Sequence, residues 1–219
     1  MKLFNIPAIL RIQSNILIIE TILLLLCLPV GFIYREPTMP FVLSAIITIV
    51  ISAVLYILSG HTDLRELSHR DGYLSVSLSW IIFSLLGAFP FVFSGATDNY
   101  IDALFETASG VTTTGASIFS NVEQLPKSIL FWRSLTHWIG GLGIIVLVII
   151  ILPSFRITNY SIFSMESSLK EKFHPKTKSI GYRLLYIYLG LTIAEIILLA
   201  AGEMDLFDSI CHTFGTVAT

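Results

Sequence analysis

Charged residues are scarce in this sequence. Only 13% of its 219 residues are Asp, Glu, Lys or Arg, while 54% are apolar; soluble domains carry about 25% charged residues. A soluble domain of this size cannot bury that much apolar surface, because the accessible surface of a folded chain falls too slowly relative to its volume. The composition therefore excludes an ordinary soluble domain and indicates a protein that lies in a lipid bilayer.

Several chemical signatures are also missing. Cys27 and Cys211 lie far apart in apolar stretches and form neither a CxxC pair nor a zinc-ligand spacing, so we expect no structural disulfide or metal site. The net charge is −2 and no Lys/Arg-rich stripe is present, so nucleic acid is not an expected partner. The ATP-binding pattern Gly-x-x-x-x-Gly-Lys-Ser/Thr is absent as well.

Five apolar stretches are long enough to cross a membrane. A spanning helix needs about 20 apolar residues, because each residue advances it by about 1.5 Å. The first stretch is too long for the apolar part of a signal peptide and no small-residue cleavage site follows it, so we interpret it as a retained helix. The sequence thus predicts an all-α polytopic membrane protein with spans at Ile16–Ile33, Phe41–Leu58, Leu74–Phe93, Ile129–Leu152 and Tyr182–Ala201.

The basic residues predict the orientation of these spans. With a cytoplasmic N-terminus, ten of the 13 Lys and Arg residues fall on the inner side, and only Arg35, Lys127 and Arg133 fall on the outer side. This asymmetry follows the positive-inside rule. We therefore expect a multi-pass protein whose N-terminus lies in the cytoplasm.

A short segment between the third and fourth spans is the most informative part of the chain. Residues Asn99–Gly110 are expected to form a helix. Thr97 or Asp98 can cap its start, and Asp102 lies where the helix dipole favours negative charge. Twelve helical residues extend only about 18 Å, against about 30 Å of hydrocarbon. The segment is therefore predicted to enter from outside, stop halfway and return as irregular chain, as a pore loop does.

The residues after this short helix suit the coordination of a dehydrated cation. A filter replaces the water oxygens of the ion by backbone carbonyls, and a threonine hydroxyl can add one more oxygen. Val and Thr favour extended backbone, and Gly115 can adopt a positive φ that helps successive carbonyls point at one axis. The preceding helix presents its partly negative C-terminal end to the same place. We therefore expect a cation filter at Val111, Thr112, Thr113, Thr114 and Gly115.

Part of this unit recurs 106 positions later. When residues 102–113 are aligned with 208–219, four of twelve positions are identical. Both copies follow a span that runs outward, so the sequence repeats a unit of span, half-length helix and filter. The second filter would comprise Val217, Ala218 and Thr219. Because the chain stops two positions before the partner of Gly115, we expect it to be a fragment of a longer protein in which a glycine follows.

Three stretches resemble a known transporter family. Residues Phe105–Ala116 (FETASGVTTTGA) and Phe131–Leu147 (FWRSLTHWIGGLGIIVL) look like the Trk/Ktr/HKT superfamily of potassium transporters, and His212–Thr219 is similar to that family's second pore segment. The Trk branch is the closest, because two spans precede the first repeat. The resemblance covers nearly the whole chain.

The resemblance implies a fold and a function. Members fold four repeats of the potassium-channel type, each a helix, a pore loop and a helix, around a pseudo-fourfold pore. This chain would supply two N-terminal helices (1–72), the first repeat (73–155), a cytoplasmic connector (156–180) and half of the second repeat (181–219). The filter positions carry over to Val111, Thr112, Thr113, Thr114, Gly115, Val217, Ala218 and Thr219. Potassium would be the transported ion, with no cofactor and no catalytic residue.

The resemblance also implies partners and a location. Family members lie in the bacterial inner membrane, usually form homodimers and are gated by cytosolic nucleotide-binding subunits of the RCK type. Residues Arg156–Lys178 would be a contact for such subunits. The second filter lacks one threonine of the first, because Ala218 replaces Thr112. This departure leaves a less selective potassium/sodium permease open.

Two further classes of function fit the sequence less well. A cation-coupled secondary transporter also uses broken helices at mid-membrane, but here the half-length helix returns to the side it entered and the repeat is parallel, not inverted. An intramembrane serine protease with Ser109 and His137 would need a glycine two residues before the serine, where Thr107 stands. We therefore expect a channel-like transporter and no enzyme, with the coupled transporter as the alternative.

Polar and small residues within the spans allow more than one interpretation. Gly140, Gly141 and Gly143 either form a bending point or permit close helix packing. Glu20 and Glu195 lie inside spans, where ionisable groups are costly, and either contribute to an ion path or make hydrogen-bonded helix contacts.

Arg133 and His137 share one face of the fourth span, because they are four residues apart. We expect them to pair with pore-loop acids such as Glu106 and to brace the filter. Direct contact with the ion is not expected, because a cation path gains nothing from an exposed positive charge.

Overall fold

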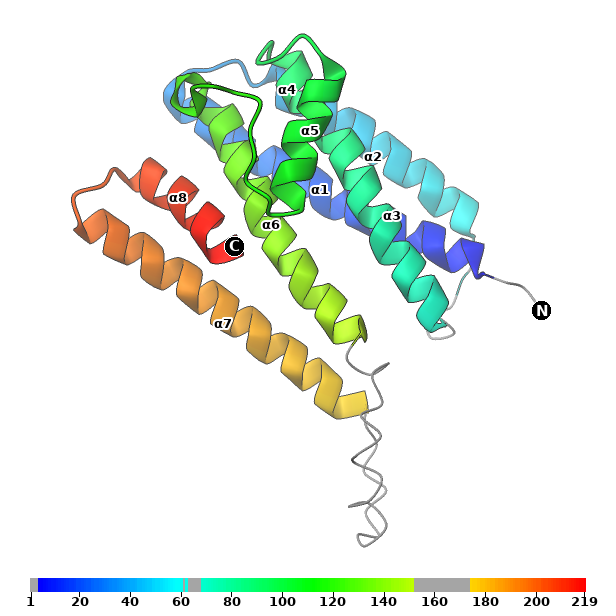
Figure 1. The fold of residues 1–219 in the computed structure, drawn as a ribbon. Coiled ribbons are helices and arrows are strands. Elements are labelled where there is room, and N and C mark those ends of the chain that lie inside the picture. Colours follow the sequence, from blue (N-terminus) through cyan, green and yellow to red (C-terminus); the bar gives the residue numbers. More distant parts are fainter. Residues whose placement is uncertain (1–3, 61, 63–67, 152–173) are drawn as a thin grey trace, which may run out of the picture.

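The computed structural model of the chain describes residues 4–60, 62, 68–151 and 174–219. These residues form helices joined by loops (Figure 1), which confirms the predicted all-α fold. The α-helices are α1 (Ile6–Tyr34), α2 (Met39–Ser59), α3 (His69–Gly87), α4 (Phe89–Phe93), α5 (Tyr100–Val111), α6 (Lys127–Ile151), α7 (His174–Ala201) and α8 (Leu206–Ala218), and one 3-10 turn, η2, covers Val122–Gln124.

The long helices match the predicted spans. Within the described ranges, four helical stretches are long and apolar enough to cross a membrane: α1, α2, the combined α3–α4 stretch from Arg70 to Phe93, and α7 from Gly181. The remaining predicted span corresponds to α6, which has 25 residues. At about 1.5 Å per residue, α6 also exceeds the thickness of the hydrocarbon core.

Helix α1 begins at Ile6, earlier than the predicted Ile16. Its start is set by Asn5, whose side chain accepts a hydrogen bond from the Ala8 N–H at 3.3 Å. The first turns also bury Gln13, whose amide donates to a backbone carbonyl of α3 at 2.8 Å. A search for apolar runs misses this part of the helix, because polar residues such as Arg11, Gln13 and Ser14 interrupt the run.

Helix α7 begins at His174, whereas the apolar run predicted a start at Tyr182. The predicted cytoplasmic connector, residues 156–180, therefore ends in helix. Residues 156–173 of that connector, including most of the predicted contact for regulatory subunits, lie outside the described residues.

The core lies where α6 packs against α3 and the N-terminal hairpin. Trp132 is fully buried there, stacks on Phe83 with ring centroids 6.2 Å apart, and donates its indole N–H to the Gly87 carbonyl at 2.9 Å. Lipid tails are as apolar as these side chains, so helices in a bilayer associate through close packing and hydrogen bonds more than through the hydrophobic effect. The Trp132 contacts supply both.

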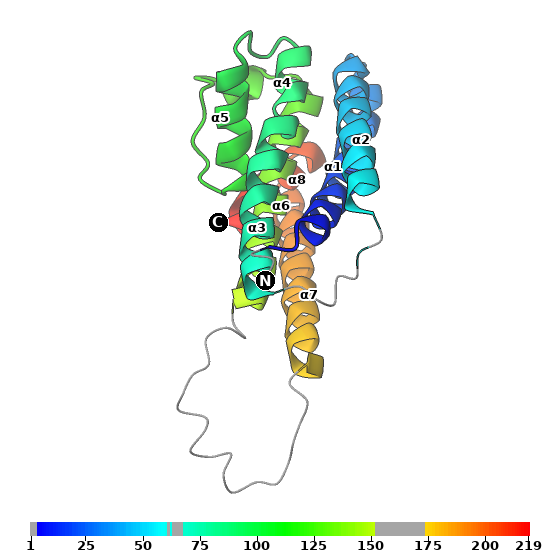
Figure 2. The ribbon, with the colours of Figure 1, turned by 90° about the vertical axis from the view of Figure 1, so that its right-hand side faces the viewer.

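The two short helices enter the molecule from the same end. Figures 1 and 2 show α5 and α8 starting near the end where α1 finishes and stopping partway along α6. Asn99, and not the predicted Thr97 or Asp98, caps α5, and Asp205 caps α8; each side chain accepts a backbone N–H at 3.0 Å. With 12 and 13 residues, both helices are too short to span, since they extend only about 20 Å.

Candidate functional site at the ends of the short helices

Helix α5 ends in a tight turn. The Thr113 N–H donates to the Gly110 carbonyl at 2.8 Å, and the Thr114 N–H donates to the Ser109 carbonyl at 2.9 Å. These are the two bonds of a Schellman motif, in which the residue after the cap is left-handed and usually glycine. Thr113 occupies that position with φ 56°. A β-branched residue is strained there by about 1–3 kcal/mol.

This geometry corrects one expectation about the proposed first filter. Extended backbone was predicted from Val111 onward, but Val111 is the last residue of α5 and Thr113 is left-handed. The reason is the Schellman motif, whose bonds draw Thr113 and Thr114 back toward the helix end. Gly115, with φ 75°, has the positive φ that the sequence predicted.

The threonine hydroxyls in this turn have different partners. Thr112 Oγ1 donates to the Ala108 carbonyl at 2.7 Å and lies 2.8 Å from Thr114 Oγ1. The Thr113 hydroxyl and the backbone carbonyls of residues 112–115 have no hydrogen-bond partner among the residues that the structure describes. Free carbonyls at membrane depth are costly unless water, an ion or protein satisfies them. These oxygens are therefore available to a ligand.

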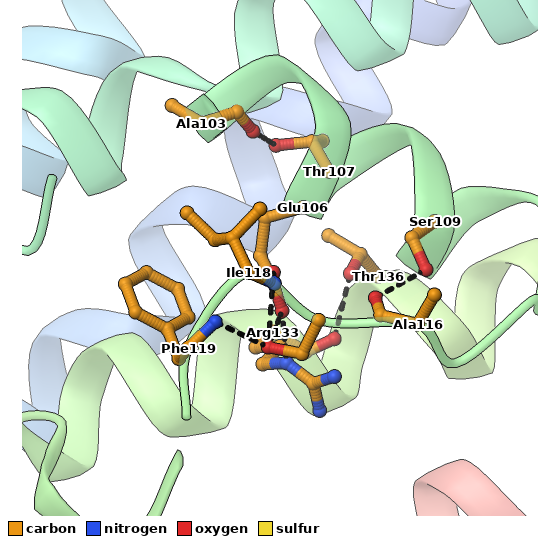
Figure 3. A network of polar contacts seen from close by, with 10 residues as sticks. Ala103, Glu106, Thr107, Ser109, Ala116, Ile118, Phe119, Arg133 and Thr136 are labelled. Carbon is orange, nitrogen blue, oxygen red and sulfur yellow. Dashed lines mark hydrogen bonds and ion pairs between the residues drawn. The ribbon is translucent and has the colours of Figure 1, made fainter. Parts of the chain in front are cut away.

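Glu106 fixes the chain that leads away from the turn. Its buried carboxylate accepts hydrogen bonds from the Ser117 hydroxyl at 3.0 and 3.1 Å, from the Ile118 N–H at 3.0 Å and from Arg133 Nε (Figure 3). The Ser109 hydroxyl adds a bond to the Ala116 carbonyl at 2.6 Å. Helix α5, the chain after the turn and α6 are thus joined at one carboxylate.

The expected bracing is confirmed for Arg133 and differs for His137. Arg133 forms an ion pair with Glu106. The His137 ring instead packs behind the turn, close to Gly110 and Gly115. Its Nε2 is buried and finds no partner in the described parts of the chain. His137 therefore supports the turn by contact.

Two adjacent glycines of α6 receive the ends of the two short helices. A Cβ on Gly140 would overlap the Val111 carbonyl at the end of α5. A Cβ on Gly141 would lie 2.6 Å from the Tyr188 hydroxyl of α7 and 3.0 Å from Ala218 Cα at the end of α8. These contacts favour the packing interpretation of the glycines. They also bring the two sequence copies to neighbouring positions on one helix.

The second copy is helical almost to its end. Val217 and Ala218 belong to α8, and the Thr219 hydroxyl donates back to the Gly215 carbonyl at 3.0 Å. Irregular chain was predicted for these residues; the helical hydrogen-bonding pattern simply continues through the first two. Their positions match those of Val111, Thr112 and Thr113 at the end of α5.

The two intramembrane acids differ in their surroundings. The Glu195 carboxylate accepts the Thr216 hydroxyl of α8, which favours its interpretation as a helix contact. Glu20 is fully buried beside Gly87, and neither carboxylate oxygen has a hydrogen-bond partner within the described ranges. A hydrogen-bonded helix contact is therefore not found for Glu20 among the described residues, and its part in an ion path stays a prediction.

Sequence reasoning missed a polar cleft beside α8. It has a volume of about 660 Å³ and is lined by η2, α6 and α8, with Glu123, Lys127, Arg133, Asp208 and His212 among its walls. Lys127 and Asp208 form an ion pair across it at 3.3 Å. The recurrence of Asp102 as Asp208 was one sequence signal for a polar residue here, but no pattern indicated that Lys127 is its partner.

Comparisons with known proteins agree on one family. The model of the TrkH cation transport protein family matches residues 37–219. The Trk system potassium uptake protein TrkH of Halomonas elongata is 36% identical over 182 residues, which cover 81% of this chain and 38% of that protein. TrkH of Escherichia coli K12 is 37% identical over 194 residues, covering 86% of this chain and 40% of the relative.

The fold is also similar to that of a solved structure from the same family. The crystal structure of the potassium transporter TrkH from Vibrio parahaemolyticus matches with a TM-score of 0.80 and 32% identity, covering 98% of this chain and 42% of that one. The chain therefore spans about two fifths of the length of the relatives that it matches.

We predict that Gly140→Ala destabilises the full-length protein. The added methyl group overlaps the Val111 carbonyl, so α6 must move away from α5, and overpacking of this kind costs about 1–3 kcal/mol. The melting temperature of the purified protein in detergent measures the loss. Gly143→Ala is the matched control, because a Cβ there meets Trp80 at an ordinary 3.7 Å. Equal melting temperatures for both variants would contradict the close contact.

We predict that Glu106→Gln and Arg133→Met have strongly non-additive effects. Arg133→Met leaves the buried Glu106 charge unpaired, which costs about 3–5 kcal/mol. Glu106→Gln leaves the partly exposed Arg133 without its ion pair, which costs less, and the double variant removes both charges. Unfolding free energies of the four proteins give the coupling energy. Asp102→Asn, on the same helix, controls for the loss of one acid. Additive losses would show that the two side chains act independently.

Proposed function

The chain belongs to the TrkH family of cation transport proteins and is an integral membrane protein, and from this premise we propose that it takes part in potassium uptake through a channel-like filter. One observation carries the proposal: two half-length helices enter from the same end, and their C-terminal ends meet adjacent glycines of α6. Half-helices that enter from one side support a parallel repeat. A coupled transporter built from inverted repeats would have them enter from opposite sides.

The first filter segment comprises Val111, Thr112, Thr113, Thr114 and Gly115, and the second begins with Val217, Ala218 and Thr219. Support comes from the free carbonyls of residues 112–115 and from the partly negative end of α5, which favours a cation. The carbonyls replace the hydration shell of the ion. The Thr113 hydroxyl, which has no hydrogen-bond partner among the described residues, is the side-chain oxygen that is free to join them.

We further propose that the chain has four parts. Residues 1–72 form an N-terminal helix pair, 73–155 the first helix–pore loop–helix repeat, 156–180 a connector and 181–219 the first half of the second repeat. The repeats in the full-length protein then surround one pore. Ala218, which replaces a threonine of the first copy, makes the filter segments unequal.

The membrane potential alone can drive uptake by such a path. It supplies about 2.3 kcal/mol per charge per 100 mV, and about 1.4 kcal/mol corresponds to a tenfold change in an equilibrium. Accumulation of roughly fiftyfold per 100 mV follows from these two values. Hydrolysis of a nucleotide by this chain is not required.

We also propose the location and partners of the protein. It lies in a bacterial inner membrane with a cytoplasmic N-terminus, as the ten-to-three distribution of basic residues supports. The names of the relatives, which refer to a Trk system, support a multicomponent assembly. We infer a homodimer that binds a cytosolic, nucleotide-binding regulatory subunit of the RCK type.

Rubidium flux into vesicles that contain the full-length protein tests the function. We expect uptake driven by a potassium diffusion potential, without a proton or sodium gradient. Uptake that requires either gradient would support a coupled transporter and contradict the channel-like path.

Gly115→Ala is predicted to reduce the rubidium flux and to raise the sodium-to-rubidium flux ratio. Gly115 has φ 75°, where a residue with a Cβ costs about 1–2 kcal/mol, so relief of this strain moves the neighbouring carbonyls. Gly95→Ala is the matched control, because Gly95 has φ 72° and lies in the loop before α5. An unchanged ratio in Gly115→Ala would argue against a filter at this turn.

A further inference from the structure

Helix α6 receives its N-terminal cap from a distant loop. The Pro126 carbonyl accepts the first helical bond, from the Leu130 N–H at 2.9 Å, so proline occupies the cap position. Its side chain has no oxygen to accept the free N–H groups of the first turn. The Glu36 carboxylate does so instead, accepting the Lys127 N–H at 2.7 Å, the Ser128 N–H at 2.8 Å and the Ser128 hydroxyl at 2.6 Å.

The loop that carries Glu36 is itself well fixed. It joins α1 to α2, and Arg35 in it is left-handed with φ 56°. The Glu36 N–H donates back to the Gly31 carbonyl at 2.9 Å, and a Cβ on Gly31 would lie 2.8 Å from the Thr38 methyl group. Pro37 restricts the backbone further. The carboxylate is therefore presented from a rigid support.

The last residue of α1, directly before this loop, contacts the start of α8. Tyr34 packs edge-on against Phe207, with ring centroids 5.3 Å apart. Lys127 lies over the same Phe207 ring at 4.7 Å and pairs with Asp208 at 3.3 Å. Both members of this ion pair are partly exposed, so it contributes little to stability. Its effect is to align the first turns of α6 and α8.

We propose that residues 34–38, the last residue of α1 and the α1–α2 loop, are a tether that holds the outer ends of α6 and α8, with Glu36 as its positioning residue. The inference rests on the proposed function, because it states how the spacing of the two filter segments is maintained. From Ser128 to Gly140, α6 extends about 18 Å, and the glycine contacts at its far end leave no free space. A shift at the outer end is therefore transmitted to the filter.

Two variants distinguish the role of Glu36 as a helix cap from its role as a tether. Glu36→Gln keeps the side-chain volume but replaces one acceptor oxygen by an amide that opposes the N–H groups of α6. Adding Pro126→Asp supplies a local cap at an exposed position without restoring the link to α1 and α2. Asp98→Asn, at an exposed acid in the loop before α5, is the control for loss of negative charge.

The full-length variants are compared by melting temperature and by the sodium-to-rubidium flux ratio. We expect Glu36→Gln to lower the melting temperature and to change the ratio about threefold or more, equivalent to about 0.7 kcal/mol. The double variant should recover the melting temperature and keep the altered ratio. Full recovery of both would overturn the tether and leave Glu36 as a cap only, and so would a wild-type ratio in Glu36→Gln.

Distances between spin labels at the exposed residues Met39 and Leu206, at the starts of α2 and α8, test the tether without transport. They should broaden in Glu36→Gln and in the double variant, but stay unchanged in Asp98→Asn. Distances as narrow as wild type in both Glu36 variants would overturn the tether. Absence of rubidium flux in the wild-type protein would instead overturn the proposed function. The spin-label distances would still show whether residues 34–38 act as a tether.

Discussion

A chain that leaves a helix inside a bilayer must find partners for its polar groups, and in this protein the Glu106 carboxylate is the partner of donor groups that follow the turn. It accepts Ser117 and Ile118 of the chain after the turn and is neutralised by Arg133 of α6. Because the carboxylate is buried, the loss of any one partner leaves an unsatisfied group in a low-dielectric site. The turn after α5 keeps its strained shape, including left-handed Thr113, because its two sides are held at this one point.

Helix α6 is the common reference for both copies of the repeated unit. Gly140 and Gly141 receive the ends of α5 and α8 at one depth, and Glu36 fixes the start of the same helix. Glycine is needed at Gly140 because the Val111 carbonyl occupies the space of a Cβ, and at Gly141 because the Tyr188 hydroxyl and Ala218 Cα lie too close to one. Because α6 is held both at its start and at these glycines, a displacement at one of the two places is transmitted to the other. The proposed filter therefore depends on the rigidity of α6.

The sequence predicted what depends on local pattern and missed what depends on contacts between distant segments. Apolar runs predicted the spans, and the shortness of residues 99–110 predicted a half-length helix. The four-residue spacing on α6 led to Arg133 and its pairing with Glu106. The left-handed Thr113 could not be foreseen, because a β-branched residue adopts that conformation only when tertiary contacts hold it. The Glu36 cap was equally hidden, since 91 residues separate it from Lys127.

The brace around the first turn is electrically balanced, and this decides where attraction for a cation originates. Glu106 is paired with Arg133, so the pair adds little net charge to the proposed path. The field must come from the free carbonyls of residues 112–115 and from the helix ends, each equivalent to about half a negative charge. In the second copy, His212 stands at the position of Glu106. A histidine cannot accept three hydrogen bonds as a carboxylate does. The proposed second filter segment would therefore require a different brace, and the proposed pore would be only approximately symmetric in its supports.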